Sequence, residues 1–219
     1  KYYEKLNYAI GESHEPGSTF KLMALVAALE DQVIDTTTVF DTQNGELTFY
    51  GKYKVRDSRK GGYGKISITE IFERSSNTGM VQAIYNKYKT KPEQFVNRLI
   101  NMGLSEPLGL PIVGEAKPVI PHPDKKGWSG ISLPWMAYGY GVSMTPMQTL
   151  TFYNAIANDG IMVRPRFIEG TQNTRRQIKK QSEVEIINPS ICSKETIGKV
   201  KSMLKGVVEK PWGTAHNIY

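Results

Sequence analysis

Residues 15–22 read Glu-Pro-Gly-Ser-Thr-Phe-Lys-Leu, and the interpretation of the whole chain starts from this stretch. The proline and glycine near its start are a turn signal. Behind them, apolar side chains recur with helical spacing and predict a core-packed helix over residues 19–29. Residues three apart lie on one face of a helix, so we expect Ser18 and Lys21 to be neighbours at its first turn.

This pair of side chains suggests nucleophilic chemistry. A serine hydroxyl is a poor nucleophile at neutral pH and needs an adjacent base. A lysine is normally charged, because its ordinary pKa is about 10.4. Two features favour a neutral Lys21: desolvation against Phe20 and Leu22, and the positive end of the helix dipole. The free N–H groups at the same helix end could hold an oxyanion beside Ser18.

The Ser-x-x-Lys spacing alone is a weak pattern, because most occurrences are a helix cap followed by a solvated lysine. The chain contains a second occurrence at Ser202 and Lys205. That pair lies inside an ordinary amphipathic helix, with no turn before it. Ser18 lies at a junction between a turn and an apolar helix, and we therefore interpret Ser18 as the candidate nucleophile.

Composition sets the broad class. The 219 residues are enough for one substantial core. No run of about 18 apolar residues occurs, so no membrane-spanning segment is predicted. The net charge of +7 indicates a solvated basic surface or attraction to an anionic surface such as phospholipid or cell wall. The densest basic cluster has no nucleic-acid motif beside it and predicts a solvated loop; it comprises Arg175, Arg176, Lys179 and Lys180.

Metal and disulfide chemistry are not indicated. Cys192 is the only cysteine, which gives neither a disulfide framework nor a cysteine metal cluster. The three histidines, His14, His122 and His216, have no ligand-like spacing. We therefore predict no metal site and no cofactor.

The remaining elements follow from turn and capping signals. Short strands are expected over 36–53, around a turn at 43–45, and again over 162–168 and 183–187. Helices are expected at 67–74, through Met80 to Tyr88, and at 92–102, 145–158 and 193–209. Capping boxes are predicted at Ser67, Thr90 and Thr145. The helix from Thr145 is apolar nearly all round and is expected to be buried. Residues 104–134 predict a long ordered loop.

Ser75, Ser76 and Asn77 lie between two predicted helices, where side chains can project into a cleft. One interpretation is structural, because serine and asparagine are common helix caps. The other is functional: Ser75 relays a proton between the lysine and a leaving group, while Asn77 binds a substrate amide through its donor and acceptor.

Ser-x-x-Lys followed by Ser-x-Asn resembles the signature of penicillin-binding proteins and serine β-lactamases. Longer stretches are similar to class B penicillin-binding proteins, and more similar to the division-type (septal) branch than to the elongation-type branch. They are Glu-Pro-Gly-Ser-Thr-Phe-Lys at 15–21, Arg-Ser-Ser-Asn-Thr-Gly-Met at 74–80, Tyr-Gly-Tyr-Gly-Val-Ser-Met-Thr-Pro-Met-Gln at 138–148 and Ala-Asn-Asp-Gly at 157–160. The resemblance covers nearly the whole chain.

The resemblance implies an α+β fold of the β-lactamase/transpeptidase type, with the helical part dominating this chain. It implies D,D-transpeptidation of peptidoglycan stem peptides ending in D-Ala-D-Ala. Ser18 would be the nucleophile, Lys21 the base, Ser75 the proton relay and Asn77 a substrate binder. β-Lactams would acylate Ser18 as substrate mimics, and no cofactor is needed. Cell-division proteins are possible partners, and nucleic acid is not expected.

The family's third motif, Lys-Thr-Gly, is missing. Gly213-Thr214-Ala215 follows Trp212 rather than a lysine, and it resembles a segment that the family carries upstream of that motif. We therefore expect residues 1–219 to be a partial transpeptidase domain that is inactive or nearly so alone, with much of the central sheet outside the sequence. The intact protein is expected to have an N-terminal membrane anchor and a pedestal domain, and to face the periplasm.

Three alternatives stay open at this point. A class A β-lactamase would carry Glu-x-x-Leu-Asn, whereas residues 93–97 read Glu-Gln-Phe-Val-Asn and lack the leucine. A β-lactam sensor domain would also be acylated, and only its flanking domains would distinguish it. A catalytically inactive binding or scaffolding module is favoured by the missing third motif.

Overall fold

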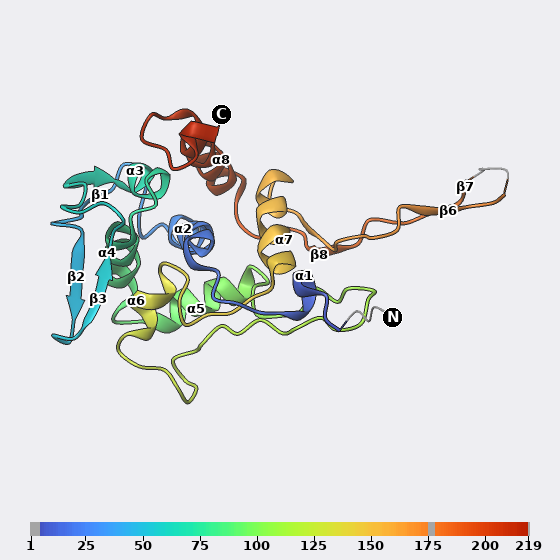
Figure 1. Cartoon of the computed structure of the whole chain (residues 1–219), viewed down its shortest axis with the longest axis horizontal. Coiled ribbons are helices and arrows are strands. Elements are labelled where there is room, and N and C mark those ends of the chain that lie inside the picture. The colour runs from blue at the N-terminus through green and yellow to red at the C-terminus, as the bar shows by residue number, and fades with distance from the viewer. Residues whose placement is uncertain (1–4, 175–177, 219) are drawn as a thin grey trace.

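The structure is a computed structural model that describes residues 5–174 and 178–218. Helices and short strands alternate irregularly, as in an α+β fold, and the helices dominate (Figure 1). The α-helices are α1 Tyr8–Gly11, α2 Lys21–Glu30, α3 Ile68–Glu73, α4 Asn77–Tyr88, α5 Pro92–Asn101, α6 Ser132–Met136, α7 Pro146–Ala157 and α8 Lys194–Glu209. In the described residues, two 3₁₀ turns, η1 Gly17–Phe20 and η2 His216–Ile218, complete the helical elements.

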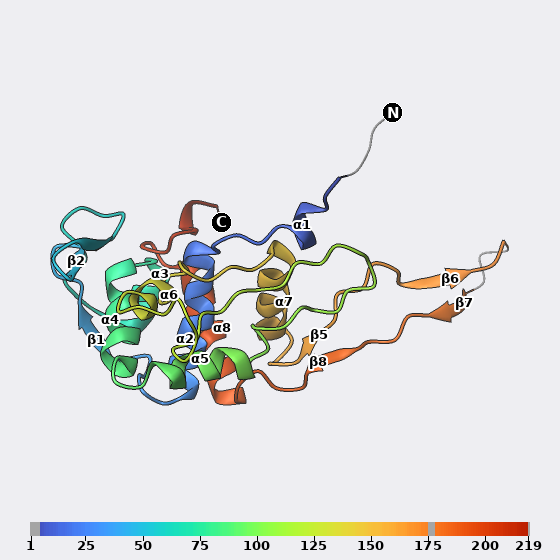
Figure 2. The same ribbon diagram turned by 90° about the horizontal axis from the view of Figure 1, so that it is seen from below.

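Helix α2 lies at the centre of the helical part, in contact with α4, α5 and α8 (Figure 2). Every side chain from Lys21 to Leu29 is buried. The prediction of a core-packed helix is therefore confirmed, and helices pack around α2 on several sides rather than on one. Its buried residues join one continuous core with those of the surrounding helices.

The start of this helix also differs from the prediction. Residues 17–20 form the 3₁₀ turn η1, and the α-helix begins only at Lys21. The tighter turn arises because the Lys21 N–H donates to the carbonyl of Ser18, three residues back. Ser18 and Lys21 are thus joined by one 3₁₀ turn rather than by the first turn of an α-helix.

The strands in the described residues pair two by two, always antiparallel: β1 Val39–Asp41 with β4 Lys65–Ser67, β2 Glu46–Phe49 with β3 Tyr53–Arg56, β5 Met162–Val163 with β8 Ile186–Asn188, and β6 Gly170–Gln172 with β7 Ile178–Gln181. The predicted strands on either side of residues 43–45 exist, but they do not pair with each other. At that turn Gly45 packs against the backbone of Gly62 instead, and β1 is paired with β4.

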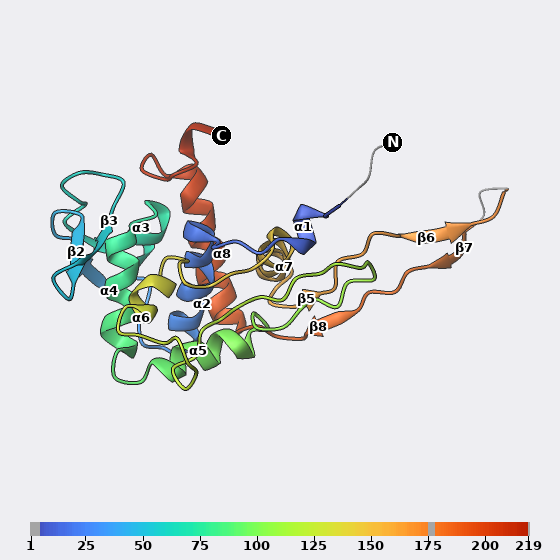
Figure 3. The ribbon, with the colours of Figure 1, turned by 60° about the horizontal axis from the view of Figure 1, so that its bottom comes forward.

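The β6–β7 hairpin extends away from the helices (Figures 1 and 3). It occupies the region predicted as a solvated basic loop. Arg175 and Arg176 lie outside the described residues, and the backbone of Lys179 and Lys180 belongs to β7. The loop prediction is therefore wrong for the second half of the cluster, where backbone pairing forms a strand.

Two of the three predicted capping boxes are confirmed. Ser67 caps α3 and Thr145 caps α7, each with the reciprocal bond from the residue three positions on. The box predicted at Thr90 is wrong, because Lys91 is the N-cap of α5 and no side chain caps it. Helix α7 was expected to be buried, and several of its residues are, yet Leu150 is 61% exposed. One face of α7 packs on α1, α8 and β5, and the face that carries Leu150 is open.

Candidate active site

Ser18 lies in an exposed turn that a distant segment holds in place. The preceding Gly17 has φ +55° and its N–H donates to the carbonyl of Gly139 at 3.0 Å. A methyl group added at Gly139 would overlap the carbonyl oxygen of Gly17, so the two backbones touch directly. His14 and Met144 exchange backbone hydrogen bonds next to this contact. The segment that contains Gly139 therefore fixes where the serine turn lies.

Lys21 lies one turn further on and is buried, with 1% of its surface exposed. Its Nζ donates to the backbone oxygen of Ser75 at 2.6 Å and contacts the Ser75 hydroxyl at 2.9 Å. Burial lowers the pKa of Lys21 to about 7, and the opposite charge of Asp57 acts against that effect. A substantial fraction of Lys21 is then neutral at neutral pH, as a general base requires.

Ser75 adopts a backbone conformation that few non-glycine residues adopt. Its φ is +54°. It follows α3 in a Schellman arrangement: the Ser75 N–H donates to Phe72 O at 3.0 Å and the Ser76 N–H to Ile71 O at 2.9 Å. Glycine is the usual residue at this position because it has no side chain to clash. A serine here places its hydroxyl beside Lys21.

Ser76 and Asn77 begin α4. The Ser76 hydroxyl caps the helix by accepting from Gly79 N–H at 3.0 Å. The structural interpretation from the sequence is thus confirmed for Ser76. Asn77 is half-buried, and its Nδ2 donates to Arg56 O at 2.7 Å. In the described part of the structure its Oδ1 accepts no hydrogen bond, so one face of the amide is free to pair with a peptide group.

Asp57 belongs to this site and was not predicted. It lies in the loop after β3, and its carboxylate accepts from the Ser76 hydroxyl at 3.1 Å, the Thr78 N–H at 2.9 Å and the Thr78 hydroxyl at 2.7 Å. The sequence gives little signal for this role, because the residue stands in a polar loop with no motif around it.

The structure brings Lys21 and Ser75 into direct contact and places Ser18 one turn from Lys21. Among the described residues, the Ser18 hydroxyl makes no hydrogen bond, and it is exposed. The second Ser-x-x-Lys pair is different: Ser202 lies on the surface of α8, and Lys205 forms an exposed ion pair with Glu209 at 3.4 Å. The site therefore forms around Ser18 and not around Ser202.

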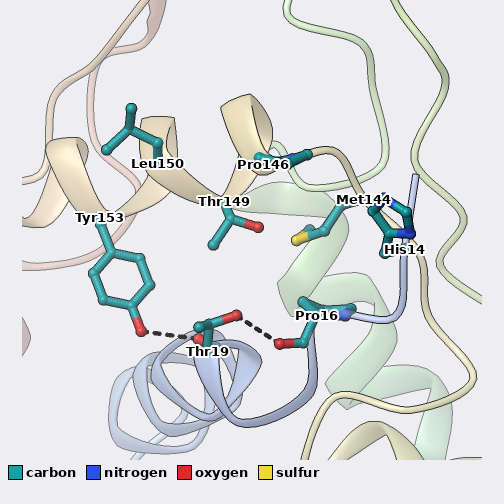
Figure 4. A pocket seen from close by; sticks show the side chains of 8 residues that line it. All are labelled: His14, Pro16, Thr19, Met144, Pro146, Thr149, Leu150 and Tyr153. Atoms are coloured by element: carbon teal, nitrogen blue, oxygen red, sulfur yellow. Dashed lines mark hydrogen bonds between the residues drawn. The ribbon is translucent and has the colours of Figure 1, made fainter. Parts of the chain in front are cut away.

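A groove of about 480 Å³ lies between the serine turn and α7 (Figure 4). Thr19 crosses its floor, with its hydroxyl bonded to Pro16 O at 2.8 Å and its carbonyl accepting from the Tyr153 hydroxyl at 3.0 Å. The other lining groups are mainly apolar and come from His14, Met144, Pro146, Thr149 and Leu150. The groove thus joins the start of η1 to the open face of α7.

No metal-like cluster and no membrane-spanning helix occur in the part of the chain that the structure describes. Groups of three or more histidine, cysteine or acidic side chains that could hold an ion are absent from those residues. None of the helices there is both long enough and apolar enough to cross a bilayer. The single cysteine, Cys192, is buried, and burial raises the pKa of its thiol to about 12.

The model of the penicillin-binding protein transpeptidase domain matches residues 2–219. The chain belongs to this family. It is 30% identical over 207 residues to penicillin-binding protein PbpB of Mycobacterium tuberculosis, covering 93% of this chain and 29% of that protein. It is 27% identical over 215 residues to stage V sporulation protein D of Bacillus subtilis, covering 97% of this chain and 32% of that protein. The chain therefore spans about a third of these relatives.

Solved structures give the same result. The transpeptidase domain of penicillin-binding protein 3 from Burkholderia pseudomallei superposes with a TM-score of 0.77 at 27% identity, covering 97% of this chain and 59% of that one. Penicillin-binding protein 3 of Mycobacterium tuberculosis, solved in complex with aztreonam, superposes with a TM-score of 0.76 at 30% identity. The match covers 94% of this chain and 44% of that one. The predicted α+β transpeptidase-like fold and the resemblance to division-type class B proteins are confirmed.

Proposed function

We propose that the protein containing this chain is a serine D,D-transpeptidase that cross-links peptidoglycan. One observation carries the proposal: a buried lysine, with its pKa lowered to about 7, is bonded to Ser75 one turn from an exposed serine. Relatives from Buchnera aphidicola and Escherichia coli are named peptidoglycan D,D-transpeptidase FtsI, at 31% and 28% identity over 155 residues. Family membership and site geometry support the same reaction.

In the proposed first step, Ser18 Oγ attacks the carbonyl carbon between the two terminal D-alanines. Neutral Lys21 accepts the hydroxyl proton, and a backbone N–H at the start of the helix stabilises the oxyanion. The C–N bond then breaks, and the leaving D-alanine amine takes a proton that passes from Lys21 through the Ser75 hydroxyl. An ester between Ser18 and the shortened stem peptide remains.

The second step reverses these roles. The amine of a neighbouring stem attacks the ester, its proton passes to the same relay, and the Ser18 oxygen recovers a proton as the cross-link forms. Asn77 holds the backbone of the stem peptide through its free amide face. Positioned proton transfer of this kind contributes about 10²–10⁴ in rate.

The setting of the protein is part of the proposal. β-Lactams would acylate Ser18 as substrate mimics, in line with the solved relative that was complexed with aztreonam. The names of the relatives support a role in cell-wall synthesis and division. We place the intact protein at the periplasmic face of the cytoplasmic membrane, held by an anchor outside this sequence. Cell-division proteins are the proposed partners, and neither nucleic acid nor a cofactor is required.

Labelling by a fluorescent penicillin tests the proposal in the whole protein. We expect a stable covalent adduct on Ser18, lost in Ser18→Ala and retained in Ser202→Ala, which removes the serine of the second Ser-x-x-Lys pair. Slow release of the label supports a transpeptidase. Rapid hydrolysis would instead support a β-lactamase, and no labelling would support an inactive scaffold.

A further inference from the structure

Asp57 connects the loop after β3 to the start of α4. Both of its oxygens accept hydrogen bonds from the buried residues Ser76 and Thr78. The neighbouring Arg56 carbonyl accepts from Asn77. The last residue of β3 and the first residue of the following loop therefore bind three consecutive residues at the start of α4. The carboxylate also lies at the N-terminal, positive end of this twelve-residue helix, where a negative charge interacts favourably with the helix dipole.

The residues that Asp57 binds alternate with the residues of the active site. Ser76 and Thr78 are fully buried, while Ser75 and Asn77 are partly open. When the buried pair is fixed, the open pair cannot rotate independently, because all four belong to one turn. Ser75 is held in its left-handed conformation by α3 on one side and by this anchor on the other.

On these contacts, and on the proposed function, we propose that Asp57 is a positioning residue for acyl transfer, which anchors the Ser75–Asn77 turn and places a negative charge facing Lys21. In the described residues Asp57 forms no ion pair, and its negative charge acts on Lys21. Its charge therefore stabilises the ammonium that forms when Lys21 takes the proton of Ser18.

Other charged groups do not share this role. Helices α4 and α5 pack on α2 and carry Tyr88 and Arg98. Both of these side chains bond to Asp31, at the end of α2 far from Lys21. The N-cap residue of α8, Ser193, bonds Glu30 at that same end, and η1 carries no charged side chain. Asp57 is the charged group that acts on Lys21 in the described part of the chain.

Asp57→Asn in the whole protein separates charge from shape. The amide has nearly the same size, its oxygen still accepts from Thr78 N–H, and the Thr78 hydroxyl can turn to accept from the new NH₂. We expect two effects on the rate of acylation by a fluorescent penicillin. The midpoint of the pH profile moves to lower pH, because the ammonium loses its opposite charge. The plateau rate falls about tenfold, because the developing ammonium is less stabilised.

Three further variants keep the test sharp. Thr78→Val removes one bond to Asp57 and keeps the charge, so it slows acylation without moving the midpoint. Asp57→Glu also keeps the negative charge, although its longer side chain displaces the carboxylate oxygens. The midpoint of its pH profile should therefore match that of the wild type. Asp124→Asn removes an exposed carboxylate whose ion-pair partner among the described residues is His122, and it should change neither the plateau rate nor the midpoint.

An unchanged plateau and midpoint in Asp57→Asn, or a midpoint that moves to higher pH, would overturn the inference. If Asp57→Asn does not fold, a shift to lower pH in Asp57→Glu would overturn it, because that variant retains the charge. Failure of the proposed function is distinguishable, since the wild-type protein would then not be labelled at Ser18 at all.

Discussion

At the residue scale, Ser75 shows a conflict between stability and chemistry. A left-handed backbone costs a non-glycine residue about 1–2 kcal/mol, and Ser75 has φ +54° at a position where glycine is usual. Glycine would relieve that strain but would remove the hydroxyl that contacts Lys21 at 2.9 Å. Strain of this kind persists where the side chain is needed.

Comparing Ser75→Gly with Ser75→Ala tests that explanation. Both variants lose the hydroxyl and should be acylated about 10²-fold more slowly or worse, since a positioned proton relay is worth that much. Only glycine relieves the backbone strain, so Ser75→Gly should be about 1 kcal/mol more stable than Ser75→Ala in denaturant unfolding. Equal stability of the two variants would show that the backbone of Ser75 is not strained.

The lowered pKa of Lys21 predicts the pH dependence of the wild-type protein. Acylation should rise with pH through a midpoint near 7, because only neutral Lys21 accepts the proton of Ser18. Between that pH and about 10.4 the unfolded chain binds more protons than the folded one, so the contribution of Lys21 to stability also increases with pH over this window. Rates of penicillin acylation at a series of pH values check the first effect, and a midpoint close to the ordinary lysine value would contradict it.

The residues of the site were predictable to different degrees. Ser18 and Lys21 stand three apart beside a turn, and the Ser75–Asn77 junction stands between two helices, so local spacing indicated both. The role of Asp57 depends on a loop reaching across to α4, a contact between residues 21 positions apart. No local pattern encodes that contact, and the sequence therefore gave no prediction for it.

At the scale of elements, the segment after α8 packs on α3, the helix that ends just before Ser75. The Trp212 indole N–H donates to the buried Glu73 carboxylate at 2.7 Å, and the Thr214 N–H donates to Glu73 O at 3.1 Å. The Arg74 guanidinium lies 5.1 Å from the Trp212 ring. Gly206 of α8 leaves room for the Glu73 side chain, which a methyl group there would displace.

Trp212→Phe should therefore weaken the docking of this segment on α3. It leaves a buried carboxylate oxygen without its donor, which costs about 1–3 kcal/mol of unfolding free energy. Denaturant unfolding measures the loss, with Tyr8→Phe on an exposed ring as the neutral control. Gly206→Ala should destabilise the same contact, and the double variant should lose less than the sum of the two single losses. Full additivity would show that Trp212 and Gly206 do not act on a common Glu73 contact.

Elements were predicted best where their signals are local. The boundaries of α3, α7 and α8 follow from their capping residues Ser67, Thr145 and Ser193, each within three positions of its partner. The pairing of β1 with β4 joins strands more than twenty residues apart, and no local sequence pattern between them indicates this pairing. The exposed face of α7 was missed for a related reason, because composition alone does not tell which side of an apolar helix is covered.

At the scale of the whole molecule, α2 and the η1 turn before it connect the polar Ser75 turn to the apolar groove beside α7. Its buried length carries Lys21 into contact with the Ser75 turn, and the η1 turn before it borders the apolar groove under α7. The chain covers 59% of the solved Burkholderia pseudomallei transpeptidase domain, so a large part of that domain has no counterpart here. We propose that the family's Lys-Thr-Gly motif and most of its central sheet belong to that part.

That proposal predicts how residues 1–219 behave alone. Lys21 and Ser75 are assembled within the chain, whereas one wall of the site and the second oxyanion N–H are expected from outside it. Loss of one oxyanion donor typically costs about 10²–10³ in rate, so labelling of the isolated chain by a fluorescent penicillin should be at least that much slower than labelling of the whole protein. A cooperative unfolding transition would establish that the isolated chain is folded, and Ser18→Ala supplies the background. Labelling at the rate of the whole protein would mean that the described residues already form the complete acylation site, with the oxyanion held by the start of the Ser18 turn alone.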